Sequence, residues 1–362
     1  MPATGKNILV CPLAWGAGHT TRMIPVMREL ISMGHNVIAG GEIWQNELVS
    51  REIPGIMCIH FPGFNIRYSS YLPQYLKIIL SLPLFFYHTI TEHFRLRKII
   101  RQYNIDITIS DSRPGLRNRK IKSVLVTHML RIPFPKGFRV LENLLLPFIR
   151  AFLKNFTFCL VPDLPGEINL SGDLSHNLPL PGNVRYTGIL SRFSDYGNGK
   201  ERKKEYRCVA IMSGPSPQRE MLTGIISSLL RKTGRKSVIF AGPGKRKAEL
   251  TGDGLQIICT ESSGEMAEKI LSGEIIVTRP GYTTLMELYS LGRSALIIPT
   301  PGQPEQEYLA GYLSGRGWFV KAEQNRLDAV TLEDFSEPLL PFYSPEENRD
   351  LLVKVLKELT DQ

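Results

Sequence analysis

The chain has 362 residues, more than a single hydrophobic core usually supports, so two domains of ordinary size are expected. A hydrophobic content of 43% and a charged content of 22% are typical of a globular protein and exclude an intrinsically disordered one. The formal net charge of +10 indicates an anionic partner, which could be a nucleic acid, an anionic membrane surface or a phosphorylated small molecule.

The cysteines and the apolar runs indicate the compartment. The five cysteines lie far apart and form no Cys-x-x-Cys pair or Cys/His cluster, which argues against a disulfide framework and a zinc site. No run approaches the roughly 20 apolar residues that span a bilayer. The apolar run at 8–14 is broken by Pro12 and reads as a buried strand rather than a secretion signal. We therefore expect a cytoplasmic protein, with peripheral attachment to the inner face of the membrane as an open alternative.

The first half alternates strands and helices. A strand over 7–13, a helix with apolar residues at helical spacing over 23–31 and a strand at 37–39 make a βαβ opening, which favours a parallel sheet. Three further strands are predicted, over 105–110, 123–126 and 156–161. They end in polar residues, and such strand ends line the crevice where open α/β sheets bind ligands.

The second half repeats this alternation after a segment rich in Gly, Ser, Pro and Asn at 171–198. Strands are predicted over 207–212, 236–241, 257–259, 274–277 and 295–299, with helices between them and a last helix over 344–359. We expect an N-terminal domain over 1–190 and a C-terminal domain over 191–362. The predicted fold class is α/β, with two Rossmann-like, doubly wound parallel-sheet domains facing each other across a cleft. The last helix closes the chain and could pack back on the N-terminal domain.

The most informative stretch runs from 275 to 287. A buried strand ends in Arg279-Pro280-Gly281, and a helix begins at Thr283 and Thr284. The unpaired N–H groups and positive dipole end of such a helix attract a diphosphate, to which Arg279 adds charge and the threonines add hydroxyl donors. Glu287 lies one turn later on the same face, where its carboxylate could accept both hydroxyls of a ribose. Alternatively, Thr284-x-x-Glu287 is a capping box, which would make Glu287 a structural residue.

A second polar loop follows the next predicted strand. Residues 299–306 read Pro-Thr-Pro-Gly-Gln-Pro-Glu-Gln, so amide and carboxylate groups, including Gln303 and Gln306, gather at a strand's carboxyl end. By itself this loop could be an ordinary polar turn. Two such loops at neighbouring strand ends favour a ligand site.

The region from 279 to 308 resembles the donor-binding region of glycosyltransferase family 28, which includes the transferase that adds N-acetylglucosamine to the lipid-linked peptidoglycan precursor. The resemblance implies the two-domain GT-B fold and inversion at the anomeric carbon. It also implies that Gly281 opens a helix, that Glu287 holds the nucleotide ribose and that Gln306 lies near the donor sugar. The Pro-Gly-Gln-x-Glu-Gln form of residues 301–306 is closer still to a bacterial and archaeal branch of these proteins.

Two glycine loops extend the resemblance. Ser213-Gly214-Pro215-Ser216 matches a loop near the donor phosphates, with Pro215 departing from the small-residue pattern of the family. Gly16-Ala17-Gly18-His19-Thr20-Thr21-Arg22 has the branch's G-x-G-H-x-x-R form. The implied role is to approach acceptor or donor phosphates, with His19 as a general base; a helix-start residue that only caps is the alternative. As a dinucleotide fingerprint the loop fails, because Thr21 stands where the third glycine would be, which argues against NAD.

Asp111 and His128 end strands in the same half and resemble acceptor-side loops of the close relatives. Asp111 is the second catalytic candidate, and His128 joins the acceptor or phosphate loop. No D-x-D motif is present, which disfavours the metal-dependent architecture for glycosyl transfer. We therefore expect no metal and no cofactor, because a nucleotide sugar is a substrate.

Two apolar stretches with basic neighbours, over 76–86 and 139–154, could lie on an anionic membrane surface, as a lipid-linked acceptor would require. They could equally be core helices with solvated edges. Lysine and arginine are spread along the chain without aromatic interleaving, which argues against a nucleic-acid partner.

The sequence therefore predicts a glycosyltransferase that moves a sugar from a nucleotide donor, for which UDP is favoured, to the hydroxyl of an unknown acceptor. Two alternatives stay open. A sugar-nucleotide 2-epimerase of the same fold would convert the donor without any acceptor. A non-catalytic relative that binds a nucleotide sugar or a lipid phosphate would bind the donor without turnover.

Overall fold

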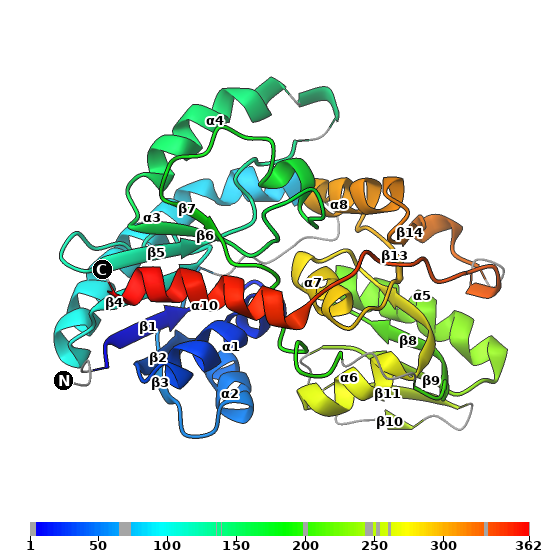
Figure 1. The fold of residues 1–362 in the computed structure, drawn as a ribbon. Helices are drawn as coiled ribbons and strands as arrows, with labels where there is room; N and C mark the ends of the chain where they lie inside the picture. Colours follow the sequence, from blue (N-terminus) through cyan, green and yellow to red (C-terminus); the bar gives the residue numbers. More distant parts are fainter. Residues whose placement is uncertain are drawn as a thin grey trace.

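The computed structural model describes residues 5–64, 74–134, 136–138, 140–197, 202–242, 249–250, 254–259, 262–328 and 332–361. It contains two α/β domains that lie side by side, each built on one sheet (Figure 1). This arrangement confirms the predicted fold class.

The N-terminal sheet has the strand order β3-β2-β1-β4-β5-β6-β7, and every neighbouring pair is parallel. Its strands are β1 (Asn7–Cys11), β2 (Asn36–Gly41), β3 (Met57–His60), β4 (Ile107–Asp111), β5 (Lys122–Val126), β6 (Phe158–Val161) and β7 (Val184–Tyr186). The helices between them are α1 (Ala17–Ser32), α2 (Ile43–Glu52), α3 (Gln74–Tyr103) and α4 (Val140–Leu153). The central strands β1, β4 and β5 are buried almost throughout, because helices cover both faces of a parallel sheet.

The C-terminal sheet has the order β10-β11-β9-β8-β12-β13-β14, in which only the β10–β11 pair is antiparallel among the described strands. Its strands are β8 (Tyr206–Ile211), β9 (Ser237–Phe240), β10 (Glu249–Leu250), β11 (Leu255–Ile258), β12 (Gly273–Thr278), β13 (Leu296–Ile297) and β14 (Val320–Lys321). The helices are α5 (Gln218–Thr233), α6 (Ser263–Leu271), α7 (Tyr282–Ser290), α8 (Pro304–Gly315) and α10 (Pro345–Asp361). Short edge strands, including β3, β7, β10 and β14, were not predicted, because two to four residues carry too little periodicity.

Each sheet grows outward in both directions from its first strand. The strand order therefore reverses between β1 and β4 in the first sheet and between β8 and β12 in the second. At such a reversal the loops leave the sheet to opposite sides and open a crevice at the carboxyl ends of the strands. The fold thus directs two loop pairs towards the contact between the domains, those after β1 and β4 and those after β8 and β12.

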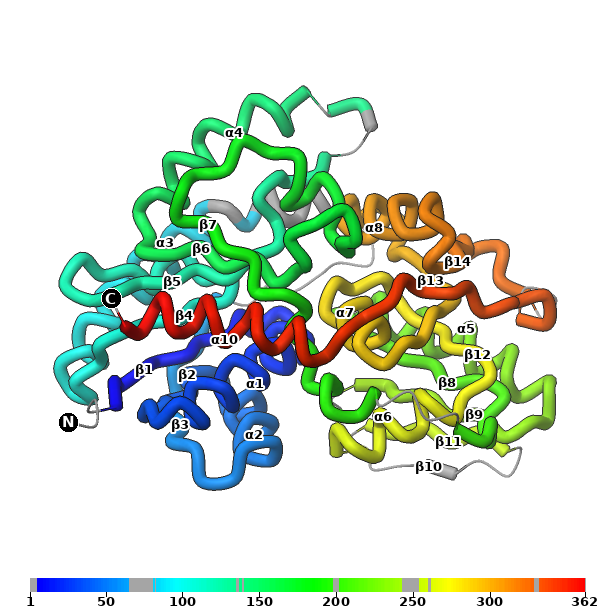
Figure 2. Tube along the Cα trace, viewed as in Figure 1, coloured from blue at the N-terminus to red at the C-terminus, as the bar shows by residue number. Residues whose placement is uncertain are grey.

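Helix α10 returns from the C-terminal domain and lies along the N-terminal one (Figures 1 and 2). Arg185 Nη2 lies 2.7 Å from Glu358 Oε1, and Asn348 Nδ2 donates to Ile189 O at 3.0 Å. Gly188 has a φ of 75°, and a Cβ there would lie 2.3 Å from Asn348 Oδ1, so only glycine fits where the chain leaves the first sheet.

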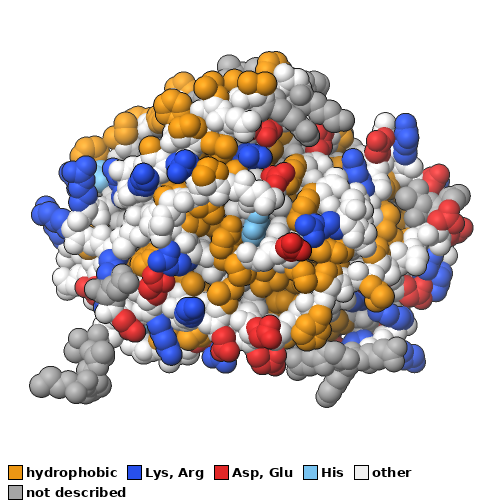
Figure 3. Space-filling model, turned by 45° about the horizontal axis from the view of Figure 1, so that its top comes forward, with side chains coloured by type: hydrophobic (Ala, Val, Ile, Leu, Met, Phe, Trp, Pro, Cys, Tyr) orange, Lys and Arg blue, Asp and Glu red, His pale blue; other side chains and the backbone are white. Residues whose placement is uncertain are grey.

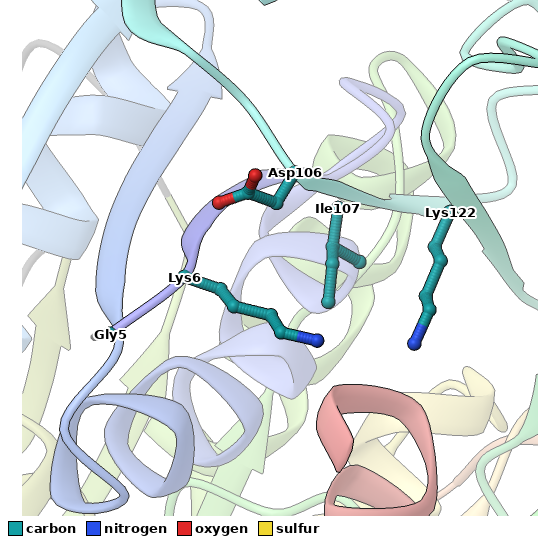
Figure 4. A pocket seen from close by; sticks show the side chains of 5 residues that line it. All are labelled: Gly5, Lys6, Asp106, Ile107 and Lys122. Atoms are coloured by element: carbon teal, nitrogen blue, oxygen red, sulfur yellow. The ribbon is translucent and has the colours of Figure 1, made fainter. Parts of the chain in front are cut away.

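The end of α10 borders a cavity of about 300 Å³ that is lined by Gly5, Lys6, Asp106, Ile107 and Lys122. Figure 4 shows Lys6, which precedes β1, and Lys122 of β5 on either side of Ile107 of β4. Lys122 Nζ donates to Leu359 O at 2.7 Å, and Lys6 Nζ donates to Thr360 O. Cations stabilise a helix C-terminus. The two lysines that line this cavity therefore serve to dock the end of α10 on the N-terminal domain.

Candidate functional site

The start of α7 lies at the reversal point of the C-terminal sheet. Its N-cap is Gly281, which has no side chain to cap the first N–H groups. A Cβ on Gly281 would lie 3.4 Å from Ser213 Oγ and 3.8 Å from Thr284 Oγ1, so the loop after β8 adjoins this helix start. Small residues thus bring backbone N–H groups and two hydroxyls together, as an anion site requires. Gly214, with a φ of 99°, turns the same loop.

Glu287 does not belong to a capping box. Thr284 lies inside the helix rather than at its N-cap, so the capping alternative is wrong. Instead, Glu287 Oε1 accepts a hydrogen bond from Arg192 Nε at 2.8 Å; the Glu287 side chain is buried, and that of Arg192 is 11% exposed. Arg192 lies in the segment between the domains and has no motif around it, so sequence reasoning missed it. A buried carboxylate beside a guanidinium at a helix start suits a ribose and its attached phosphates.

Arg279 does not take the role expected from the sequence. Its side chain is buried, Nη1 donates to the carbonyls of Ile298 and Pro299 at 3.1 Å each, and Nη2 donates to Gln324 Oε1 at 2.6 Å. Burial lowers its pKa to about 10, which leaves it charged at neutral pH. The guanidinium therefore ties the end of β13 to the loops beneath the site, and these contacts do not present it to a diphosphate.

In the N-terminal domain, three predicted residues form one cluster at the carboxyl ends of β1 and β4. Asp111 Oδ2 lies 3.0 Å from His19 Nδ1 and accepts from Arg22 Nε at 2.8 Å. Arg22 Nη2 also donates to Asp111 Oδ1 and lies 2.9 Å from His19 Nδ1. Arg22 and Asp111 are fully buried, whereas the His19 ring remains 23% exposed. Arg22 and Asp111 therefore hold the imidazole at Nδ1, while part of the ring remains accessible.

The electrostatics of this cluster favour a neutral His19 imidazole next to an ionised Asp111 carboxylate. Burial opposes ionisation of Asp111, but the charges of Arg22 and His19 hold its pKa well below the ordinary value. Burial, followed by the charge of Arg22, lowers the pKa of His19 below 6.5, although Asp111 acts in the opposite direction. Arg22 Nη2 only donates and would pair with a lone pair on His19 Nδ1, whereas the ionised Asp111 carboxylate only accepts and requires a proton there. We assign the tautomer that the Asp111 contact selects, with the proton on Nδ1 and the lone pair on Nε2. Such an imidazole can act as a base.

The two loop systems touch directly across the domain contact. Thr283 Oγ1 donates to Gly18 O at 3.1 Å, and a Cβ added to Gly18 would lie 3.1 Å from the Thr283 side chain. Gly16, with a φ of 141°, begins the same loop. Glycine at position 18 is therefore what allows the loop before His19 to reach the start of α7.

A second contact joins the strand end after β5 to α7 and α8. The ring of His128 stacks on Tyr282 with centroids 3.9 Å apart and planes 4° from parallel. His128 Nε2 lies 2.8 Å from Glu305 Oε1. Glu305 was not selected from the sequence, although it stands in the polar loop that was. The useful signal was its place between two glutamines, in the first turn of a helix that follows a strand.

Gln303 and Gln306 are engaged within their own loop. Gln303 is the N-cap of α8, and its Oε1 accepts from Gln306 N. Gln306 Oε1 accepts from Thr300 N at 2.8 Å. Both glutamines thereby shape the turn that carries Glu305, and a role at the donor sugar stays a prediction.

The comparisons with known proteins are consistent with this geometry. Residues 226–349 match the family described as glycosyltransferase family 28 C-terminal domain. An uncharacterised glycosyltransferase of Methanosarcina acetivorans is 21% identical over 356 residues, which are 91% of this chain and 89% of the relative. A UDP-N-acetylglucosamine--N-acetylmuramyl-(pentapeptide) pyrophosphoryl-undecaprenol N-acetylglucosamine transferase of Haemophilus influenzae is 27% identical over 150 residues, 41% of this chain and 42% of the relative.

Among solved structures, the glycotransferase of kitacinnamycin superimposes with a TM-score of 0.59 and 16% sequence identity. The match covers 98% of this chain and 99% of that one. At this identity the likeness shows the fold, and it extends over both domains.

Proposed function

We propose that this chain is a glycosyltransferase of the GT-B type with a family 28 C-terminal domain, and that it transfers a sugar from a nucleoside diphosphate to an acceptor hydroxyl. We further propose that the donor is a UDP-sugar, that the anomeric centre inverts and that no metal takes part. One observation carries this proposal: the His19–Asp111 pair and the uncapped start of α7 face the same interdomain contact, joined through Thr283 and Gly18.

The reaction follows from this placement as a single displacement. His19 Nε2 takes the proton of the acceptor hydroxyl while the acceptor oxygen forms a bond to the anomeric carbon. The bond between that carbon and the β-phosphate oxygen breaks, and its electron pair leaves with the nucleoside diphosphate. The N–H groups and hydroxyls at the start of α7 stabilise the charge of the leaving group. Asp111 stabilises the imidazolium that forms.

The test is a screen of UDP-, GDP- and dTDP-sugars by thermal shift, followed by measurement of released nucleoside diphosphate with candidate acceptors. We expect stabilisation by UDP-sugars and acceptor-dependent UDP release. An epimer formed without any acceptor, or donor binding without turnover across a broad acceptor set, would contradict glycosyl transfer.

Glu287→Ala should raise the dissociation constant of UDP by about 10- to 100-fold, because a charged acceptor of two ribose hydrogen bonds is lost. Isothermal titration with UDP measures this. Glu287→Gln, which keeps one carbonyl oxygen, should lie between alanine and the wild type. A folded Glu287→Ala variant that binds UDP as the wild type does would remove Glu287 from the nucleotide site.

We also propose that the acceptor is carried on a lipid and that α4 meets an anionic membrane. Val140, Leu144 and Phe148 follow one another every four residues and are 82%, 61% and 70% exposed, so one face of α4 is apolar and uncovered. Figure 3 shows hydrophobic side chains gathered along the rim of the molecule where α4 lies. Arg150 lies on the same helix and the exposed Lys154 follows directly after its end, and the net charge of +10 favours anionic lipid.

Part of the predicted membrane surface falls outside the described residues, namely Arg139 and the side chains of 76–80 and 82. Of the helices that the structure describes, none combines the length and the hydropathy needed to cross a bilayer. Attachment through α4 would therefore be interfacial.

A Leu144→Glu/Phe148→Glu double variant should bind vesicles of phosphatidylglycerol and phosphatidylcholine at least about tenfold more weakly than the wild type, because two apolar side chains leave the interface. Co-sedimentation at low and physiological salt measures this. Ile43→Glu on α2, where the wild-type side chain is 65% exposed, is the matched control and should bind normally. Wild-type protein that stays in the supernatant at low salt would reject the membrane proposal.

A further inference from the structure

His128 is enclosed by groups from both domains. It follows β5 of the N-terminal domain, but its ring stacks on Tyr282 at the start of α7, and its Nε2 lies 2.8 Å from Glu305 Oε1 in the first turn of α8. Only 5% of the residue is exposed. Its other ring nitrogen, Nδ1, is buried without a hydrogen-bond partner among the described residues. The orientation of the His128 ring is thus fixed by its stacking on Tyr282 and by one hydrogen bond to Glu305.

That hydrogen bond has a defined direction. An ionised carboxylate accepts and does not donate, so the proton lies on His128 Nε2 and points to Glu305. Burial opposes ionisation of Glu305, yet the hydrogen bond and charge of His128 lower its pKa, and the charge of His19 contributes in the same sense. Glu305 is therefore an ionised acceptor whose pKa is lowered by two histidines of the N-terminal domain, His128 and His19.

The position of Glu305 in its helix makes this contact necessary. Glu305 follows Pro304 in the first turn of α8, where the helix dipole attracts a carboxylate back towards the helix's own N–H groups. Within its own loop the carboxylate has a contact at 3.4 Å, from Gln303 Nε2 to Oε2. The shorter bond from His128 draws the carboxylate the other way, across the domain contact and towards the cluster of His19.

We propose that His128 is a positioning residue: its Nε2–H holds the Glu305 carboxylate in the cleft, where it accepts a hydroxyl of the donor sugar. This inference rests on the proposed function. Because His128 belongs to the N-terminal domain and Glu305 to the C-terminal domain, the contact with the sugar forms only when the domains are closed. Its effect falls on the sugar part of the donor and not on the nucleotide.

Two variants of His128 separate this role from packing. The side-chain amide nitrogen of glutamine reaches the place of Nε2, whereas that of asparagine reaches only the place of Nδ1. The ligands are the nucleotide sugar that stabilises the wild type most and its nucleoside diphosphate alone. We expect His128→Asn to raise the dissociation constant and the KM of the nucleotide sugar about tenfold, with the nucleoside diphosphate bound as before. His128→Gln should restore the nucleotide-sugar values to within about threefold of the wild type.

Glu305→Gln should give the same selective loss as His128→Asn, and the double variant should lose little more, since both changes remove one interaction. The matched control is His176, which is also buried, stacks on Tyr186 at 4.8 Å and lies 3.3 Å from Asp163. His176→Asn should lower the melting temperature without changing the ratio between nucleotide-sugar and nucleoside-diphosphate affinities.

Equal weakening of both ligands, or equal behaviour of the glutamine and asparagine variants, would overturn the positioning role while leaving the proposed function intact. A wild type that binds no nucleotide sugar would overturn both. The two failures are therefore distinguishable.

Discussion

Replacing His19 with alanine should reduce kcat by about 100- to 10,000-fold, which is the range that a positioned general base supplies. The dissociation constant of the nucleoside diphosphate should change little, because the nucleotide contacts proposed here come from the C-terminal domain. The fold should persist, since the buried pair of Arg22 and Asp111 remains intact in this variant. Initial rates of nucleoside diphosphate release, together with isothermal titration, measure both quantities.

The same base sets the pH dependence. Burial and the charge of Arg22 lower the pKa of His19 below its ordinary value of 6.5, so the neutral and active form persists into mildly acidic solution. The acid limb of kcat/KM should therefore fall below pH 6.5, and it should be absent from the residual activity of His19→Ala. His60→Ala provides the control, because that ring is 59% exposed and contacts Glu42 only at 3.8 Å. A His19 variant with the rate and acid limb of the wild type would remove His19 from the mechanism.

Asp111→Ala should be the most destabilising of these substitutions, by about 3 to 5 kcal/mol in the free energy of unfolding. The change leaves the guanidinium of Arg22, which is 2% exposed, buried without its carboxylate partner. Activity should fall as well, because His19 loses the group that orients its ring. Chemical denaturation monitored by circular dichroism measures the loss of stability.

Glu29→Ala is the comparison that isolates burial. Glu29 pairs with Arg349 at 3.1 Å, but the arginine is 67% exposed, so we expect a loss below about 1 kcal/mol. The pH profile gives a second check. The pKa of Asp111 is depressed in the folded state, so its contribution is complete above its ordinary value of 3.8 and is lost as the pH falls below it. Similar losses for Asp111→Ala and Glu29→Ala would contradict the account of a buried, coupled pair.

The parts that could be predicted from the sequence depend on short-range patterns. β1 and β12 contain uninterrupted apolar runs, as strands covered on both faces do, whereas β4 alternates isoleucine with threonine and serine. The polar ends of those strands then marked the cleft, since parallel strands bring their carboxyl ends to one edge. Asp111 was selected as such a strand end, His19 and Arg22 were selected from the resemblance of their glycine loop, and the three residues do form one cluster.

What those selected side chains contact was not available from the sequence. Arg279 stands beside the predicted diphosphate site, yet the packing around it directs its guanidinium to the carbonyls of residues 298 and 299. The capping box at Thr284 had the right spacing, but α7 begins at Tyr282, and Glu287 pairs instead with Arg192, 95 residues away. A local spacing rule identifies which contacts are possible and does not choose among them.

The sequence by itself therefore determined the α/β class, the two-domain order and the strand ends at which polar residues gather, because period and turn chemistry are local properties. Only the tertiary structure decided which of those residues meet. His128 and Glu305 are 177 residues apart and become partners when one domain packs against the other. Such pairings depend on burial and on the relative placement of the sheets, which are properties of the folded chain as a whole.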